Sequence, residues 1–388
     1  MRHLQSHLLL ATCLLASQVL PAAAASQQPL FDVPRAPSPT RSSPLVELHK
    51  SLVEIPSLTG SEHNVTAFLH THLTALGLTV ETQPVTPSRA NILAYLGPSR
   101  ASRILLTSHL DTVPPFLPYR RLNSTLYGRG SVDAKASVAA QIGAFSGLAR
   151  SGAIRAGDVA LLFVVGEERG GAGMRAANDL RLAWEAVVFG EPTERRLGRG
   201  HKGGIGFTLT AHGRAAHSGY PERGRNAIDA LVRALAALQR VDWPSSEAFG
   251  ETTLNVGEIH GGVAPNVVPE RASARAAVRI AAGEPQLIRR LVRDAVAAAT
   301  ADVEVEFTAG IGPVPIDHDV EGFETAVLNY GTDIPNLHGA HKRYLYGPGT
   351  ILVAHSPDEH VELGDLEEAV EGYKLLIREI LKRKVGAP

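Results

Sequence analysis

The sequence has almost no cysteine, few aromatic residues and no excess of charge of either sign. Its one cysteine among 388 residues is Cys13, so we expect no disulfide and no cysteine-bound metal in the rest of the chain. The net charge is −1 and the basic residues form no block. This balance excludes the charge pattern typical of a protein that binds nucleic acid or a membrane surface. A small-molecule partner is therefore expected.

Long apolar runs are also missing, except at the N-terminus. There, Arg2 precedes an apolar run over residues 8–20 and a cluster of alanines at 22–25, which is typical of a signal peptide. The run is shorter than the roughly 20 residues that span a bilayer. We therefore expect residues 1–25 to be a signal peptide and the protein to be secreted to the extracellular space, with no membrane anchor.

Two further features agree with export. Residues 26–44 are rich in Pro and Ser without an apolar period, which predicts an extended arm. The triplets that begin at Asn64 and Asn123 are acceptors for N-glycosylation, although such triplets also arise by chance.

From about Leu45 onward, segments with helical and with strand periodicity alternate. This alternation favours the α/β class, with a mixed, largely parallel sheet and flanking helices. Helices are predicted at 62–76 and 136–150, and strands at 104–109, 186–192 and in the run LLFVV that begins at Leu161.

Beyond Gly200 the pattern changes to strands that alternate apolar and polar residues, as half-exposed strands do. We expect an inserted, smaller α+β domain at 201–308 within a larger domain made of 45–200 and 309–388. Strands are predicted at 204–213, 272–281 and 303–307, and helices at 225–238, 284–300 and, to close the chain, 365–384.

Three predicted strands end in polar residues, in the stretches LLTSHLD, LLFVVGEE and AVVFGE. Ligands of open α/β sheets gather beyond the carboxyl ends of the strands, so these three ends can form one site. His109 and Asp111 are two apart on a strand and project from the same side. One can then bind a metal while the other orients the site, although a histidine that only ends a strand is the alternative.

The adjacent acids Glu167 and Glu168 point in different directions on an extended backbone. Glu168 is interpreted as a metal ligand and Glu167 as the acceptor of a proton from the attacking water. The alternative is that one of them pairs with Arg169 at an exposed strand end. Asp133 follows a glycine-rich turn and precedes a helix, so it either caps that helix or bridges two metals.

Glu191 and His355 complete a set of two imidazoles and three carboxylates. Such a set suits zinc and, less well, cobalt or manganese. A carboxylate shared by two ions would give a two-metal centre. Residues 198–203 match a glycine pattern for dinucleotides, but a strand is predicted to follow where that motif needs a helix.

Taken together, these motifs resemble the co-catalytic zinc metallopeptidase family that includes aminoacylase, acetylornithine deacetylase, succinyl-diaminopimelate desuccinylase and the glutamate carboxypeptidases. The resemblance extends from Leu45 to the C-terminus. The motifs that carry it are, in order, SHLDTVPP, GRGSVDAK, GEERGG, GEPTE, GRAAHSGYP, APNVVPE and GPGTILVAHSPDE.

The resemblance implies two zinc ions per chain, with Asp133 bridging them. His109 and Glu191 would complete the ligands of one ion, and Glu168 and His355 those of the other. Glu167 would be the general base, and Asp111 would orient a metal ligand without binding metal itself.

The resemblance implies that 201–308 is a lid or dimerisation domain and that 45–200 and 309–388 form the catalytic domain. It also assigns roles to residues near the substrate. His217, in the lid, would steady the oxyanion, in many relatives across a homodimer interface. Asn266 and Arg279 would grip the substrate, and the turn at Gly349 would line the pocket. Ala136 departs from the family, which usually has Gly there.

The expected function is a secreted di-zinc hydrolase that cleaves an amide or peptide bond next to a free carboxylate, as a carboxypeptidase does. An N-acyl amino acid deacylase of the acetylornithine deacetylase type is the alternative. A non-catalytic, metal-stabilised protein that binds peptides is an alternative of another class. The expected partner is a small peptide or an N-acyl amino acid.

Overall fold

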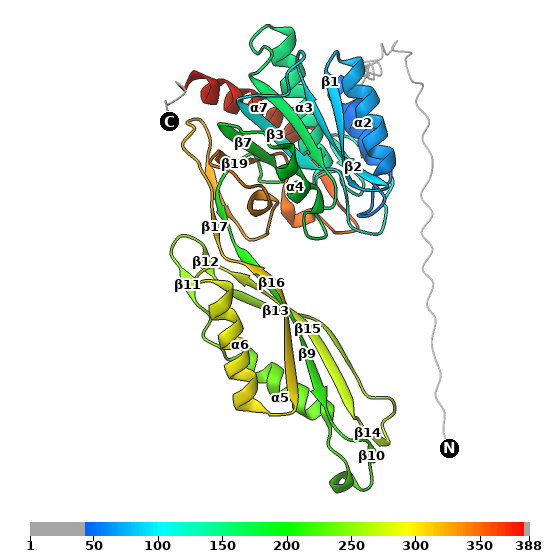
Figure 1. Ribbon diagram of the computed structural model, residues 1–388. Helices are drawn as coiled ribbons and strands as arrows, with labels where there is room; N and C mark the ends of the chain where they lie inside the picture. Colours follow the sequence, from blue (N-terminus) through cyan, green and yellow to red (C-terminus); the bar gives the residue numbers. More distant parts are fainter. Residues whose placement is uncertain (1–42, 384–388) are drawn as a thin grey trace, which may run out of the picture. The chain divides into compact units, whose positions relative to one another are not determined.

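The computed structural model describes residues 43–383, and its largest element is a six-stranded mixed sheet (Figure 1). β3 pairs in parallel with β6 and β7, and β19 pairs in parallel with β7, while β1 and β2 add an antiparallel edge. The expected mixed, largely parallel sheet is confirmed. In spatial order its strands are β1 (Thr79–Thr86), β2 (Arg89–Tyr95), β6 (Val159–Val164), β3 (Ile104–His109), β7 (Ala186–Gly190) and β19 (Lys342–Tyr346).

Helices cover both faces of this sheet, because its central strands are apolar on both sides. In β6, Leu161 and Phe163 pack into one core while Leu162 and Val164 pack into the other. The first core is closed by α1 (Pro44–Glu54), α2 (His63–Ala75), α3 (Lys135–Arg150) and α7 (Leu363–Lys382). The second is closed by α4 (Ala172–Ala177), the short helix η1 (Asn178–Leu180) and the segment around η3 (Ile334–Asn336).

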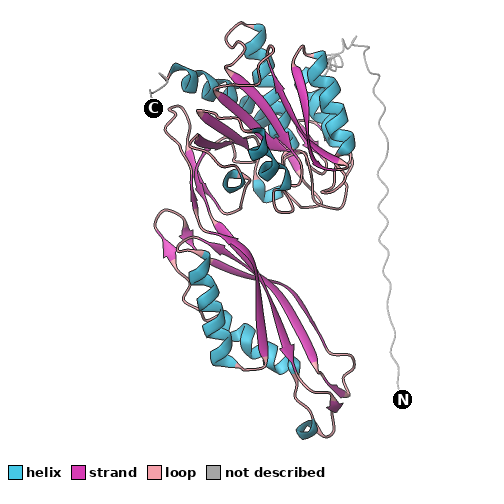
Figure 2. Ribbon diagram, viewed as in Figure 1, coloured by secondary structure: helices cyan, strands magenta, loops and turns pink. Residues whose placement is uncertain are grey.

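A second, fully antiparallel sheet follows the first in the sequence. Its strands are, in spatial order, β13 (Thr253–Gly261), β15 (Arg271–Ile280), β9 (Gly203–His212) and β16 (Val303–Ile311). Alternate side chains of β9 are buried, and they form a third core with α5 (Ala227–Leu238) and α6 (Pro285–Ala299). This gives the two layers, sheet and helices, visible in Figure 2.

Four small sheets complete the fold. One of them is formed by the segments that enter and leave the second sheet. That sheet contains β17 (Val314–Pro315), β8 (Leu197–His201) and β18 (Thr325–Leu328). The others are β20 (His360–Glu362) with β5 (Thr125–Tyr127) and β4 (Arg120–Leu122), then β10 (Ala216–His217) with β14 (Val267–Val268), and β11 (Ser245–Ser246) with β12 (Gly250–Glu251). The remaining short helices are η2 (Pro221–Arg223) and η4 (Ile351–Val353).

The expected domain limits stay predictions, although the second sheet spans residues 203–311, close to the expected insertion at 201–308. α1 begins at Pro44, within the range expected for the arm. The expected signal peptide and nearly all of the arm lie outside the described residues. Within residues 43–383, no helix combines the length and apolar character that crossing a membrane requires.

Gly190, at the end of β7, lets two helices approach the sheet closely. A Cβ atom at this position would lie 2.6 Å from Nε2 of Gln141, 2.8 Å from Cβ of Ser137 and 2.9 Å from the hydroxyl of Tyr373. Its carbonyl accepts a hydrogen bond of 2.9 Å from the Ser108 hydroxyl. The absent side chain therefore fixes how α3 and α7 sit against the strand that leads into Glu191.

We expect Gly190→Ala to lower the free energy of unfolding by about 1–3 kcal/mol, because the extra methyl group overpacks this contact. Gly364→Ala is the matched control, since a Cβ at Gly364, in the first turn of α7, has no neighbour within 4 Å. Urea unfolding of both variants measures the difference. Equal stability of the two variants would contradict the role given to Gly190.

Candidate active site

The five predicted metal ligands lie at the carboxyl ends of the parallel strands. His109 is the last residue of β3, Glu168 follows β6, and Glu191 follows β7 directly. Asp133 lies just before α3, and His355 lies in the segment after β19. Parallel strands place their carboxyl ends on the same side of the sheet, which is why residues so distant in sequence meet there.

Asp133 lies between the two imidazoles. Its Oδ1 is 3.0 Å from Nε2 of His109, and its Oδ2 is 3.3 Å from Nε2 of His355. Nε2 of His109 is also 3.9 Å from Oε2 of Glu191, and Nε2 of His355 is 3.1 Å from Oε1 of Glu168. The five residues thus form two groups that share Asp133, which is the grouping that the resemblance implies. Their roles as ligands stay predictions.

The backbone holds these groups in place. His355 has a φ of 62°, a left-handed conformation that is uncommon for a residue other than glycine. Ser131, Val132 and Asp133 form a buried turn before α3. A left-handed conformation at a residue other than glycine is frequent where a side chain must be held for function.

The electrostatics of the cluster suit a divalent cation. Burial, together with Asp133, Glu167 and Glu168, raises the pKa of Glu191 well above its usual value, although His109 acts the other way. Hydrogen bonds that the His355 imidazole donates to the carboxylates of Asp133 and Glu168 raise the pKa of His355 to about 10. Close carboxylates repel one another, and a bound cation offsets that repulsion while displacing the protons. Ligand atoms of His109, Asp133 and Glu168 lie within 4.8 Å of one another, close enough to share an ion.

Asp111 fixes the turn that carries the two adjacent glutamates. Its Oδ1 accepts the backbone N–H of Glu167 at 2.9 Å, and its Oδ2 accepts that of Glu168 at 3.2 Å. Thr59 donates its hydroxyl to the same Oδ2 at 2.8 Å. Nδ1 of His109 is 2.9 Å from the backbone oxygen of Asp111, but 3.7 Å from its carboxylate. Asp111 therefore orients His109 through its main chain and the glutamates through its side chain.

A cavity of about 540 Å³ opens onto the cluster. Burial raises the pKa of Glu167, on its wall, well above the usual value, and neighbouring acids raise it further against the effect of His109. Two arginines, Arg175 and Arg279, supply positive charge to a wall that is otherwise acidic. The charged and polar residues that line the cavity are Asp133, Glu167, Glu168, Arg175, Glu191, Arg279, Tyr330, Thr332, Asn336 and His355.

The structure does not bring His217 and Asn266 to this cavity. Arg279, which lines it, pairs with Gly204 at one end of β9, while His212 pairs with Arg271 at the other end. Eight residues of strand separate these ends by roughly 26 Å. His217 lies still further along the chain, in β10, where Ser218 N–H donates to the backbone oxygen of Asn266 at 3.0 Å.

Gly349 is beside the cluster but not among the residues that line the cavity. Its φ is 69°, and a Cβ there would lie 2.5 Å from Cγ2 of Val132. Its backbone oxygen accepts the N–H of Glu194 at 2.7 Å. Gly349 thus allows close packing against the turn that carries Asp133, and the assigned contact with substrate stays a prediction.

Sequence reasoning missed Glu359, which holds the turn before Asp133. This buried carboxylate accepts backbone N–H groups of Gly130, Val132 and Asp133 at 2.9, 3.4 and 3.3 Å through Oε1. Its Oε2 pairs with the buried guanidinium of Arg129 at 2.5 Å. The only signal in the sequence is an acid four residues after His355. Arg175 carried no signal that distinguishes it from a surface arginine.

Comparisons with known proteins agree with this geometry. The peptidase dimerisation domain family matches residues 199–304. A peptidase M20 domain-containing protein of Schizosaccharomyces pombe is 46% identical over 338 residues, which cover 86% of this chain and 84% of that protein. A probable carboxypeptidase of Aspergillus clavatus is 45% identical over 377 residues, which cover 89% of this chain and 90% of that protein.

Solved structures show the same fold. An M20 family metallo-carboxypeptidase from Sulfolobus solfataricus has a TM-score of 0.70 at 16% identity and covers 87% of this chain and 99% of its own. A dinuclear metal-binding M20 peptidase from Bacillus subtilis has a TM-score of 0.63 at 16% identity, over 87% of this chain and 98% of its own. The chain belongs to the M20 peptidase family. It is therefore a hydrolase that acts on peptide bonds.

We expect Glu359→Gln to lower the free energy of unfolding by about 3–5 kcal/mol, because it leaves the buried Arg129 without its counter-charge. Glu367→Gln, at an exposed position of α7, is the control and should change stability by less than about 0.5 kcal/mol. Chemical unfolding of both variants, followed by circular dichroism, measures the effect. A loss below about 1 kcal/mol for Glu359→Gln would contradict this role.

Proposed function

We propose that this chain is a carboxypeptidase whose five clustered residues hold two zinc ions, with Asp133 between them. The observation that carries the proposal is the position of Asp133, with one oxygen near His109 and the other near His355. The fungal relative named as a probable carboxypeptidase supports the choice of peptide C-termini as substrates. Nitrogen and oxygen donors of this kind suit zinc, with cobalt or manganese as substitutes.

The two groups of residues would divide the ligands. His109 and Glu191 would hold one ion and Glu168 and His355 the other, with Asp133 shared. When bound, the ions would polarise the scissile carbonyl and favour ionisation of water. Asp111 keeps Glu168 aimed at this point, because it holds the backbone of that residue.

Glu167 would handle the proton. It lines the cavity beside Asp133 and Glu168, and its backbone N–H is fixed by Asp111. Its carboxylate would accept a proton from the attacking water and return that proton to the leaving amine nitrogen. Because burial raises its pKa, the carboxylate is a stronger base than an exposed glutamate.

Arg279 would select substrates with a free carboxylate. Its side chain lines the same cavity as Glu167, and a guanidinium can donate two parallel hydrogen bonds to a carboxylate. An N-acyl amino acid carries the same carboxylate next to an amide bond, so a deacylase would use the same residues. Arg279 therefore fits both substrate classes, and the name of the relative favours peptides.

The inserted sheet would form a homodimer, which the match to a peptidase dimerisation domain supports. His217 and Asn266 do not line the cavity of their own chain. We therefore place their action in the cavity of a partner subunit, where His217 would donate to the oxyanion.

Export from the cell is part of the proposal. The N-terminal charge and apolar run favour a signal peptide. Asn64 on α2 and Asn123 in the turn between β4 and β5 are both exposed, so a glycan can be accommodated at either position. Both sites remain predictions.

We expect Glu167→Gln to retain zinc while hydrolysis slows by a factor on the order of 10²–10⁴, because only proton transfer is lost. Glu168→Ala should instead lose metal, and a chelator should abolish wild-type activity. Zinc content is measured by elemental analysis, and hydrolysis by mass spectrometry with N-blocked dipeptides and N-acyl amino acids. Full activity of Glu167→Gln would remove it from the mechanism, and faster cleavage of N-acyl amino acids would favour the deacylase.

Coexpression of His217→Ala with Glu167→Gln tests the action across subunits. Half of randomly formed dimers are mixed, and each mixed dimer holds one complete site of two, so about a quarter of the wild-type activity should return. Each variant expressed alone is the control. If coexpression gives no more than the sum of the two controls, His217 acts within its own chain or not at all.

A further inference from the structure

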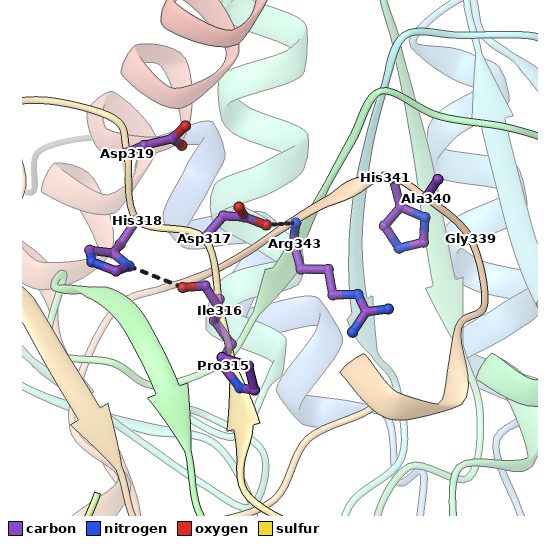
Figure 3. A pocket seen from close by; sticks show the side chains of 9 residues that line it. All are labelled: Pro315, Ile316, Asp317, His318, Asp319, Gly339, Ala340, His341 and Arg343. Atoms are coloured by element: carbon purple, nitrogen blue, oxygen red, sulfur yellow. Dashed lines mark hydrogen bonds between the residues drawn. The ribbon is translucent and has the colours of Figure 1, made fainter. Parts of the chain in front are cut away.

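A second cavity, of about 560 Å³, lies beside the edge strand β19 (Figure 3). Its walls come from residues 315–319, which follow β17, and from residues 339–343, which lead into β19. Lys342 pairs with Ala186 at the start of β7, whereas Glu191 follows the end of that strand. The cavity therefore lies at the amino ends of β7 and β19, whereas the candidate active site lies at the carboxyl ends of the strands. The two cavities share no lining residue.

The acidic groups of this cavity already have partners. Oδ2 of Asp317 accepts the backbone N–H of Arg343 at 2.9 Å. Asp319 accepts the hydroxyl of Tyr344 at 2.7 Å and pairs with Lys342 and, at 3.2 Å, with Arg383. Oδ1 of Asp317 lies 3.9 Å from Nζ of Lys342. Lys342 and Arg383 therefore offset the negative charges of Asp317 and Asp319.

The guanidinium of Arg343, by contrast, makes no hydrogen bond or ion pair with the residues of the described chain, 43–383. The side chain is half-buried, and Figure 3 shows it extending into the cavity, away from the carboxylates of Asp317 and Asp319. A guanidinium that is partly removed from water and lacks a counter-charge is energetically unfavourable. Its planar fork of donors matches a carboxylate or a phosphate group.

The neighbouring imidazole does not supply a counter-charge. His341 is 7% exposed, and its Nε2 has no hydrogen-bond partner. Burial, followed by the charge of Arg343, lowers the pKa of His341 to about 4, so the ring is neutral near pH 7. Gly339 allows the ring to lie close, because a Cβ there would be 2.6 Å from its Nδ1. The wall beside Arg343 is thus neutral and closely packed.

We propose that this cavity binds an oxyanion, the carboxylate or phosphate group of a small molecule, through the guanidinium of Arg343. The exposed imidazole of His318 lies at its rim, with Nδ1 3.0 Å from the backbone oxygen of Ile316. Residues 315–319 return the chain from the inserted sheet, and residues 339–343 lead into β19 of the large sheet. A bound oxyanion would therefore connect these two segments and stabilise the folded chain.

Isothermal titration of the full-length protein with sodium phosphate and with sodium succinate, at constant ionic strength, tests this proposal. We expect saturable binding of at least one anion and a rise in the melting temperature with its concentration. Arg343→Gln should weaken that binding at least tenfold. Arg343→Lys, which keeps the charge but loses the planar fork, should weaken it less. The anion that binds more tightly identifies the chemical class.

Two control variants distinguish anion binding at Arg343 from anion binding at other arginines. Arg290→Gln, at an exposed position of α6, should bind the anion as the wild type does. Arg279→Gln, in the candidate active site, should leave unchanged the part of the anion binding that Arg343→Gln weakens. The proposal is overturned if neither anion binds at concentrations on the order of 10 mM. It is also overturned if Arg343→Gln and Arg343→Lys both bind as the wild type does, or if binding depends on Arg279 instead.

Discussion

The carboxylate of Asp133, held between His109 and His355, is the contact on which the site depends. Each imidazole approaches a different oxygen of this carboxylate, so Asp133 links the two rings. Hydrogen bonds from both imidazoles lower the pKa of Asp133, although burial acts in the opposite direction. The carboxylate therefore stays ionised where Glu167 and Glu191 tend to hold a proton.

Two further carboxylates hold the cluster from behind by accepting backbone N–H groups. Asp111 fixes the turn of Glu167 and Glu168, and Glu359 fixes the turn of Asp133. Through these contacts both acids fix the main chain that carries the clustered residues, so the positions of those side chains depend on the backbone. Such a buried carboxylate is costly unless its oxygens are satisfied, and both residues meet that condition. The positions of the clustered side chains therefore depend on the turns that carry them as well as on contacts among the side chains themselves.

The class of fold and the set of clustered residues could be predicted from the sequence because both depend on local patterns. Apolar runs that stop at His109, Glu167 and Glu191 mark strand ends, and parallel strands bring their ends together. The edge strands were not predicted. β1 contains Pro84 at an irregular register and is exposed along much of its length, so it has no apolar run. Glu359 and Arg175 could not be assigned because their roles depend on packing between segments that are distant in sequence.

The position of Arg279 links the inserted sheet to the chemistry at the cluster. Arg279 lies near the end of β15, whose pairing with β9 fixes it at the cavity, while His217 lies beyond the far end of the same sheet. A rigid antiparallel sheet cannot fold back by the roughly 26 Å that separates its ends. One sheet can thus serve two cavities, with Arg279 in the cavity of its own chain and His217 in that of a partner. If His217 acts as proposed, the length of the sheet, rather than any single residue, would make a dimer necessary for a complete site.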